Sequence, residues 1–223
     1  MSDARDRARH DVITYARRIQ AEHLVYATAG NVSTRVEGEP DVIAMTPTSF
    51  AYDALEHDDI CIVTTAGEGI AGRRGPTSEL PLHTLLYTRR PEVGAIIHTH
   101  SPAAMTMAVL GWRLPPILTG LVEAVGGDVR VAPFSRPSTA EMADTTAAAL
   151  VDRGACFMRH HGLLAVGADL ARAFLAASVT EGAAKVYLDA RAQGVDVPEL
   201  APGDVAWIAR WWHEQWPAVP ETA

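Results

Sequence analysis

Short apolar runs that follow one another closely constrain the fold of this chain more than any other feature. Five residues separate the runs 32–36 and 42–45, and four residues separate 155–158 and 163–166. A parallel pair of strands needs a crossover connection of a dozen or more residues, whereas an antiparallel pair needs only a short turn. We therefore expect a mostly antiparallel sheet. Further runs of strand length are 60–64, 94–100 and 130–132.

Helical patterns alternate with these predicted strands. Apolar residues recur at helical spacing in segments 8–25, 79–89, 102–110, 138–151, 169–188 and 204–216. Ser78 and Asp169 are expected to cap two of these helices, and Ser138 begins a capping-box pattern for a third. Helices packed on such a sheet form an α/β fold. Because no repeat or linker divides residues 1–223, we expect a single domain.

The charge balance excludes one large class of function. The chain has 19 basic and 27 acidic residues, giving a formal net charge of −8, whereas a nucleic-acid-binding surface normally carries a basic stripe. No apolar run approaches the roughly 18 residues that span a bilayer. The first residues are charged, without the apolar stretch of a signal peptide. We therefore expect a cytoplasmic protein that binds neither nucleic acid nor a membrane.

Two histidine pairs are the strongest chemical signal. His98 and His100 end the predicted strand 94–100, and because alternate strand residues share a face, both imidazoles project to one side. Imidazole suits zinc, and tetrahedral sites use three or four such ligands. His160 and His161 lie between two apolar runs, and since neighbours in an extended segment face opposite ways, we expect one of them to join the metal. Hydrogen-bonded turn histidines are the ordinary alternative.

Small turns rich in hydrogen-bond donors form a second candidate feature. Glu79 follows Thr77 and Ser78 at a predicted helix start, where free N–H groups stabilise negative charge. The same N–H groups and the two hydroxyls would suit a phosphate. Segments 30–31 and 46–49 are similar turns. From spacing alone, a simple helix cap and ordinary turns explain these residues at least as well.

Taken in order, six short motifs resemble the class II aldolase/adducin family. They are Thr28-Ala29-Gly30-Asn31-Val32-Ser33, Thr46-Pro47-Thr48, Thr77-Ser78-Glu79, His98-Thr99-His100, Gly126-Gly127 and His160-His161-Gly162-Leu163. Each motif is weak alone, but the series covers the chain from about residue 8 to 188 and is specific for the family. It is less specific for the substrate.

The resemblance implies a fold and a role for each matching residue. The family fold is a three-layer α/β/α arrangement around a central, mostly antiparallel sheet, assembled as a homotetramer with active sites between subunits. His98, His100 and His161 would bind zinc, or another divalent metal. Glu79 would be the catalytic acid/base and would also ligate the metal when no substrate is bound. The residues expected to bind the substrate phosphate are Gly30, Asn31, Thr48, Ser49, Thr77 and Ser78.

These roles imply a metal-dependent aldolase whose substrate is a small phosphorylated sugar. A ketose 1-phosphate would be cleaved to dihydroxyacetone phosphate and an aldehyde through a metal-stabilised enediolate. Lys185 is the only lysine and lies in no motif, which disfavours an imine mechanism. A pentulose-5-phosphate 4-epimerase, usually with Asp in place of Glu79, and a phosphosugar-acid decarboxylase are alternatives within the family. A non-catalytic adducin-like scaffold would lack the metal ligands, and a zinc hydrolase would not need the anion-binding turns.

The chain departs from the family pattern at the aldehyde end of the site. The fuculose-phosphate-type aldolases carry a tyrosine before the Gly-Gly pair, but either plausible register supplies Gly120 or Leu121 here. Thr119 and Glu123 are nearby polar candidates for the missing general acid. Ser49 also replaces a glycine of the phosphate segment.

The tail 204–216 is rich in tryptophan. Trp207 and Trp211 share one face of the predicted helix, while Trp212 and Trp216 share another. Packing against the core explains one aromatic face. An interface with another subunit would explain the other.

Overall fold

The computed structural model describes residues 2–215. Its strands are β1 (Asn31–Val36), β2 (Glu39–Met45), β3 (Cys61–Thr64), β4 (Gly69–Ala71), β5 (Ala95–Thr99), β6 (Arg130–Ala132), β7 (Ala155–Met158) and β8 (Gly162–Gly167). Its helices are α1 (Ser2–Ala21), α2 (Leu80–Arg89), α3 (Pro102–Leu110), α4 (Thr119–Val125), α5 (Ala140–Ala149), α6 (Leu170–Ala192) and α7 (Pro202–Gln215). Two short 3-10 helices cover Tyr52–Ala54 and His57–Asp59.

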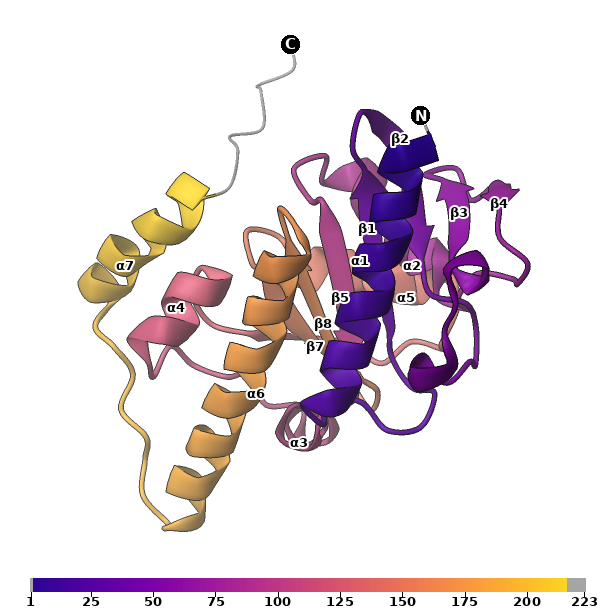
Figure 1. Cartoon of the computed structure of the whole chain (residues 1–223). Helices are drawn as coiled ribbons and strands as arrows, with labels where there is room; N and C mark the ends of the chain where they lie inside the picture. Colours follow the sequence, from indigo (N-terminus) through magenta and orange to yellow (C-terminus); the bar gives the residue numbers. More distant parts are fainter. Residues whose placement is uncertain (1, 216–223) are drawn as a thin grey trace.

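The strands form one sheet in the order β4-β3-β2-β1-β5-β8-β7-β6. Neighbouring strands are antiparallel except β6 and β7, which are parallel. Helices α1, α3 and α6 pack on one face of the sheet, and α2 and α5 pack on the other (Figure 1). The predicted three-layer α/β/α fold with a mostly antiparallel sheet is therefore confirmed.

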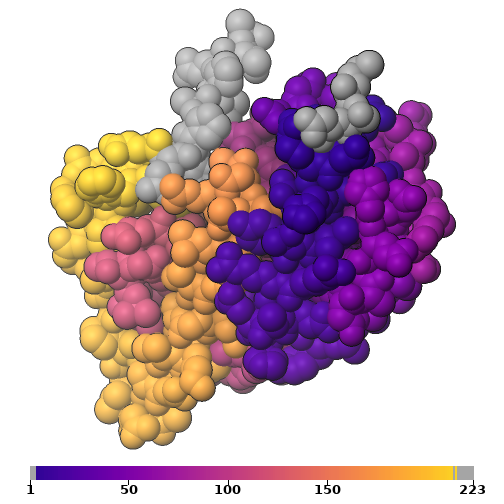
Figure 2. Space-filling view, viewed as in Figure 1, coloured from indigo at the N-terminus to yellow at the C-terminus, as the bar shows by residue number. Residues whose placement is uncertain are grey.

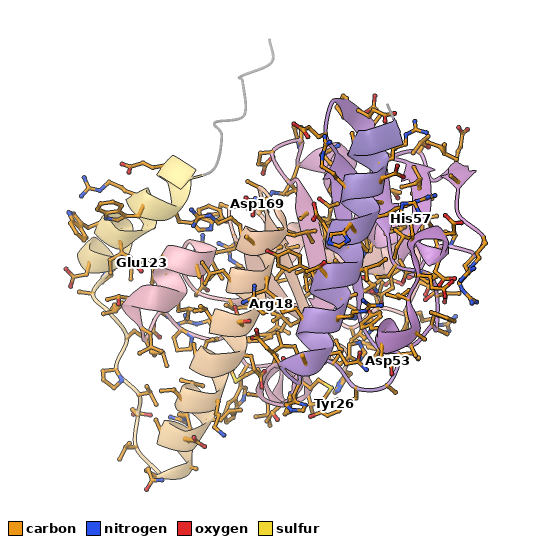
Figure 3. The ribbon with its side chains drawn as sticks, in the orientation of Figure 1. Arg18, Tyr26, Asp53, His57, Glu123 and Asp169 are labelled. Carbon is orange, nitrogen blue, oxygen red and sulfur yellow. The ribbon has the colours of Figure 1, made fainter. Side chains whose placement is uncertain are left out.

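Strand β5 shows how the sheet is held between two apolar layers. Ala95 and Ile97 belong to the core cluster under α1 and α6, while Ile96 belongs to the cluster under α2 and α5. All three side chains are fully buried, and each isoleucine contributes about 1.5–3 kcal/mol of apolar burial. On the α1 side, the Arg18 guanidinium lies 3.8 Å from the Phe174 ring centroid and links α1 to α6 (Figure 3).

Two of the three predicted helix caps are wrong by one residue. α2 begins at Leu80 with Glu79, not Ser78, at the N-cap position. α5 begins at Ala140 with Thr139 as its N-cap, because Ser138 has a left-handed φ of 63° and belongs to the preceding turn. The Asp169 cap is confirmed, since its carboxylate accepts a hydrogen bond from the Arg172 N–H.

Besides the two 3-10 helices, the sequence patterns missed two short elements. β4 is an exposed three-residue edge strand, too short for an alternation to be visible. α4 spans seven residues and includes Gly120, which has low helix propensity. α1 also ends at Ala21 rather than near Val25, because His23 takes a left-handed φ of 56°.

Helix α7 lies at the edge of the molecule, beside α4 (Figure 2). Trp212 is 5% exposed and covers Gly126, whereas Trp207 and Trp211 are 57% and 53% exposed. The two exposed rings meet edge to face with centroids 6.5 Å apart. Trp216 lies outside the described residues. One aromatic face of the tail is thus packed on the core, and the other is uncovered in the single chain.

Among the helices within residues 2–215, none has both the length and the apolar character needed to cross a membrane.

Candidate active site

Three histidines come together at the end of β5. His98 is the penultimate residue of β5, His100 follows the strand, and His161 ends the turn between β7 and β8. Antiparallel pairing of β5 with β8 aligns Thr99 with Leu163 and so brings this turn to the two histidines. The ring centroids are 4.7, 4.8 and 5.1 Å apart, and the nearest ligand nitrogens all lie within 4.8 Å of one another. This group could hold a metal ion.

The hydrogen bonding of His98 fits a metal ligand. Its Nδ1 lies 2.9 Å from the Leu163 carbonyl oxygen, which can only accept, so Nδ1 carries the proton. Nε2 then presents a lone pair to the centre of the group, as a metal-bound imidazole does when its other nitrogen is held by a carbonyl. The His98 and His100 Nε2 atoms are 2.8 Å apart. The prediction that this pair projects to one side is therefore confirmed.

Burial keeps the other two imidazoles neutral. Burial, together with the neighbouring His98 ring, lowers the pKa of His100 to about 3 and that of His161 to about 4. Neutral imidazole is the form that binds a divalent ion. The adjacent His160 is exposed, has a φ of 56° and contacts Phe134 instead. As predicted, only one member of this histidine pair joins the group.

Glu79 points into the same group instead of capping its helix. Its Oε1 lies 3.3 Å from the His161 Nε2, and its Oε2 lies 3.6 Å from the His98 Nε2. Asn31 donates a hydrogen bond to Oε2 at 3.0 Å. The side chain is only 7% exposed. Burial alone would raise the pKa of Glu79, but the His98 and His161 side chains and the hydrogen bond from the Asn31 amide more than offset it, so the pKa is lowered and the carboxylate is ionised near neutral pH.

The predicted phosphate-binding residues line one cavity with this group. The cavity measures about 190 Å³, and its lining includes Gly30, Asn31, Thr48, Ser49, Thr77 and Ser78 together with Glu79 and the three histidines. These residues lie on three turns separated by up to 48 positions in the sequence. The geometry of a pocket lined by backbone and hydroxyl donors beside a carboxylate and three imidazoles suits a phosphorylated ligand with an oxygen near the histidines.

Two residues of the cavity lie outside every sequence motif. Pro137 and Ser138, from the turn before α5, also line it. The sequence pattern at Ser138 predicts a helix cap, because a serine followed three residues later by a glutamate is typical of one. The left-handed backbone at Ser138 and Ser49, with φ of 63° and 49°, could not be inferred from residues that rarely adopt it.

The candidate general acids lie elsewhere in the single chain. Gly120 and Glu123 of α4 line a separate cavity of about 460 Å³ together with Arg172, Leu175 and Trp211. In Figure 3 Glu123 lies on α4, on the side of the molecule that carries α7. Among the described residues, neither Thr119 nor Glu123 lines the histidine cavity.

Comparisons with known proteins agree with this geometry. A family model described as Class II Aldolase and Adducin N-terminal domain matches residues 10–188. The 5-deoxy-D-ribulose 1-phosphate aldolase of Bacillus thuringiensis is 34% identical over 196 residues, covering 88% of this chain and 90% of the relative. The L-fuculose phosphate aldolase of Escherichia coli K12 is 32% identical over 179 residues, covering 80% and 81%.

A solved structure described as L-fuculose 1-phosphate aldolase superimposes with a TM-score of 0.88 at 29% identity, covering 92% of this chain and 96% of that one. The fold, the order of the motifs and the residues gathered at the cavity all point the same way. The chain belongs to the class II aldolase and adducin family and is an aldolase of that family.

Proposed function

We propose that the chain cleaves a ketose 1-phosphate to dihydroxyacetone phosphate and a short aldehyde, with zinc as its first-choice metal. The observation that carries the proposal is the Glu79 carboxylate within 3.6 Å of two imidazoles, in a cavity lined by the turns that are expected to bind phosphate. The relatives named for 5-deoxyribulose 1-phosphate and fuculose phosphate support this substrate class. Both sugars are ketose 1-phosphates, so cleavage between C-3 and C-4 yields the same phosphorylated product.

His98, His100 and His161 would hold the metal, leaving further positions open for substrate oxygens. A divalent ion bound there withdraws electron density from the ketone and stabilises the negative charge left when the C–C bond breaks. Imidazole nitrogens also bind manganese or cobalt, so the experiment must identify the bound metal.

Glu79 would move the proton at carbon. In the condensation direction its carboxylate takes a proton from C-3 of dihydroxyacetone phosphate, and in the cleavage direction it returns the proton to that carbon. The lowered pKa keeps Glu79 ionised and ready to accept. The turns that contain Gly30, Thr48 and Ser78 would bind the phosphate and so fix the position of C-3 against the carboxylate.

The enzyme is proposed to act as a homotetramer with active sites between subunits. The exposed Trp207 and Trp211, beside the cavity that Gly120 and Glu123 line, support an interface on this face. A neighbouring copy would then complete the aldehyde end of the site, where the single chain supplies no general acid from α4. This arrangement accounts for the absence of Glu123 from the histidine cavity.

The proposal is tested by metal analysis and product release on one preparation. Mass spectrometry should find about one zinc per chain, as a three-histidine site requires. A panel containing 5-deoxyribulose 1-phosphate, fuculose 1-phosphate, ribulose 5-phosphate and a phosphosugar acid is then assayed with coupled detection of dihydroxyacetone phosphate. Chelator-sensitive release from the 1-phosphates supports the aldolase. If the protein binds metal but epimerises ribulose 5-phosphate, it is an epimerase instead. If it binds metal but releases carbon dioxide from a sugar acid, it is a decarboxylase.

A further inference from the structure

His83 lies one helical turn after Glu79 in α2 and is fully buried, yet no sequence motif included it. It lies in the middle of a series of four hydrogen bonds that runs from Tyr87 to Glu79. Tyr87 OH lies 2.8 Å from Ser33 Oγ, and Ser33 Oγ lies 2.7 Å from His83 Nδ1. His83 Nε2 lies 2.5 Å from Asn31 Oδ1, and Asn31 Nδ2 lies 3.0 Å from Glu79 Oε2. The buried relay therefore ends on the carboxylate of the candidate acid/base.

Each bond of this relay has one possible direction. The ionised Glu79 carboxylate only accepts, so Asn31 turns its NH₂ group toward it and its carbonyl oxygen toward His83. His83 Nε2 must then carry the proton. Burial lowers the pKa of His83 to about 4, so the ring is neutral and its Nδ1 accepts from the Ser33 hydroxyl. Ser33 in turn accepts from Tyr87.

We propose that His83 is a positioning residue that locks the Asn31 amide with its N–H toward Glu79. This inference rests on the proposed role of Glu79 in proton transfer. Without a donor at His83, the Asn31 carbonyl oxygen loses its partner, and only the Glu79 carboxylate still holds the amide in this orientation. In the rotated amide, Oδ1 faces Glu79 Oε2, and the two oxygens repel. The carboxylate then turns from the position in which it reaches the substrate carbon, and a misplaced base transfers protons slowly.

Matched substitutions separate this role from simple packing. His83→Gln retains an N–H near the position of Nε2, whereas His83→Leu removes it. Thr84→Val is the control on the same helix, because the Thr84 hydroxyl bonds to the backbone carbonyls of Leu80 and Pro81 and takes no part in the relay. Ser33→Ala is a milder second variant, which leaves the ring in place but frees its Nδ1.

The readouts are deuterium exchange from solvent into C-3 of dihydroxyacetone phosphate, kcat and KM for cleavage, and metal content. We expect His83→Leu to lower both exchange and kcat by about 10–100-fold, as losses of supporting residues commonly do. KM and the metal content should change little. His83→Gln should recover most of the rate, Ser33→Ala should fall between the two, and Thr84→Val should match the unmodified enzyme.

A leucine variant that loses metal in parallel with activity, or a glutamine variant as slow as the leucine one, would overturn the inference. Nitrogen-15 NMR of the His83 ring gives a second test that needs no substrate. Its signals are assigned by their disappearance in His83→Gln, and we expect protonation at Nε2. A proton at Nδ1 would refute the relay as drawn. Absence of exchange in the unmodified enzyme would instead refute the proposed aldolase reaction, so the two failures are distinguishable.

Discussion

Asn31 and His98 lie directly opposite each other in the antiparallel pair β1–β5, and Glu79 approaches both of them. Opposed residues in such a pair project to the same face. The amide that contacts the carboxylate and an imidazole of the candidate metal group are therefore held by the same two central strands. This arrangement fixes the position of Glu79 from two sides, although it lies at a helix start.

Replacing Glu79 by Gln should separate proton transfer from metal binding. The amide has nearly the same shape but cannot act as a base, so we expect turnover to fall by about 10²-fold or more. His98, His100 and His161 remain, so the metal content should stay near that of the unmodified enzyme. Turnover and metal content are measured on the same preparation. An unimpaired Gln variant would eliminate Glu79 as the acid/base.

The adjacent histidines offer a comparison within one turn. We expect His161→Asn to weaken metal binding strongly, because it removes one of three ligands. His160→Asn should bind metal normally, since His160 is exposed and contacts Phe134, and asparagine tolerates its left-handed backbone. Metal titration of the two chelator-treated variants checks this. Equal affinities, or a greater loss in the His160 variant, would show that the group is assigned to the wrong residue.

Alanine substitutions at Gly30 and Gly38 distinguish the cost of a steric clash from the cost of a left-handed backbone. Both glycines have left-handed φ values, 79° and 76°. A Cβ at Gly30 would lie 2.6 Å from the His98 carbonyl oxygen, whereas a Cβ at Gly38 would meet nothing within 4 Å. Alanine at Gly38 should lower the free energy of unfolding by about 1–2 kcal/mol. Alanine at Gly30 should lower it by a further 1–3 kcal/mol or so and should displace His98.

Urea unfolding and metal titration of the two alanine variants test this difference. Equal unfolding free energies would mean that the backbone near Gly30 shifts without strain. Normal metal affinity in the Gly30 variant would show that the approach to His98 is unimportant for the site.

Trp207 and Trp211 should control assembly. Because these two rings are more than half exposed and adjacent, replacing both by Ser removes apolar area from the proposed interface without opening the core. We expect a smaller particle in sedimentation velocity, with the secondary structure unchanged by circular dichroism. Ile70→Ser, at the exposed edge strand β4, is the control. An unchanged assembly in the double variant would place the interface on another face.

The sequence was sufficient for most of the sheet and for much of the cavity, for identifiable reasons. Short connections dictate antiparallel neighbours, and the alternation of His98 and His100 dictates a shared face. In contrast, His83 could not be recognised as part of the site. Its place in the site depends on contacts with Ser33 and Asn31, about 50 residues earlier in the sequence. These contacts form only because β1 and α2 meet in the folded chain. The role of Ser138 depends on a backbone conformation that its side chain does not favour.

The buried carboxylate of Asp59 should make the free energy of unfolding depend on pH. Its side chain is fully buried and accepts hydrogen bonds from Arg73 and Arg74 at 2.7 and 2.5 Å. The Arg73 bond, against the opposing effect of burial, holds the pKa of Asp59 well below its ordinary value. A lowered pKa contributes stability above the unfolded-state pKa, near 3.9, and the contribution is lost as the pH falls toward the folded-state pKa.

We therefore expect Asp59→Asn to lower the free energy of unfolding by about 2–3 kcal/mol near pH 7. The difference from the unmodified chain should shrink steadily below about pH 4, where the unfolded-state carboxyl of the unmodified chain becomes protonated. Urea unfolding at several pH values, with chelator present so that metal binding does not contribute, measures both quantities. Asp58→Asn is the neighbouring control, because that carboxylate is 70% exposed and should matter little. A difference that stays constant from pH 7 to pH 3 would mean that the ionised carboxylate of Asp59 is not what stabilises this turn.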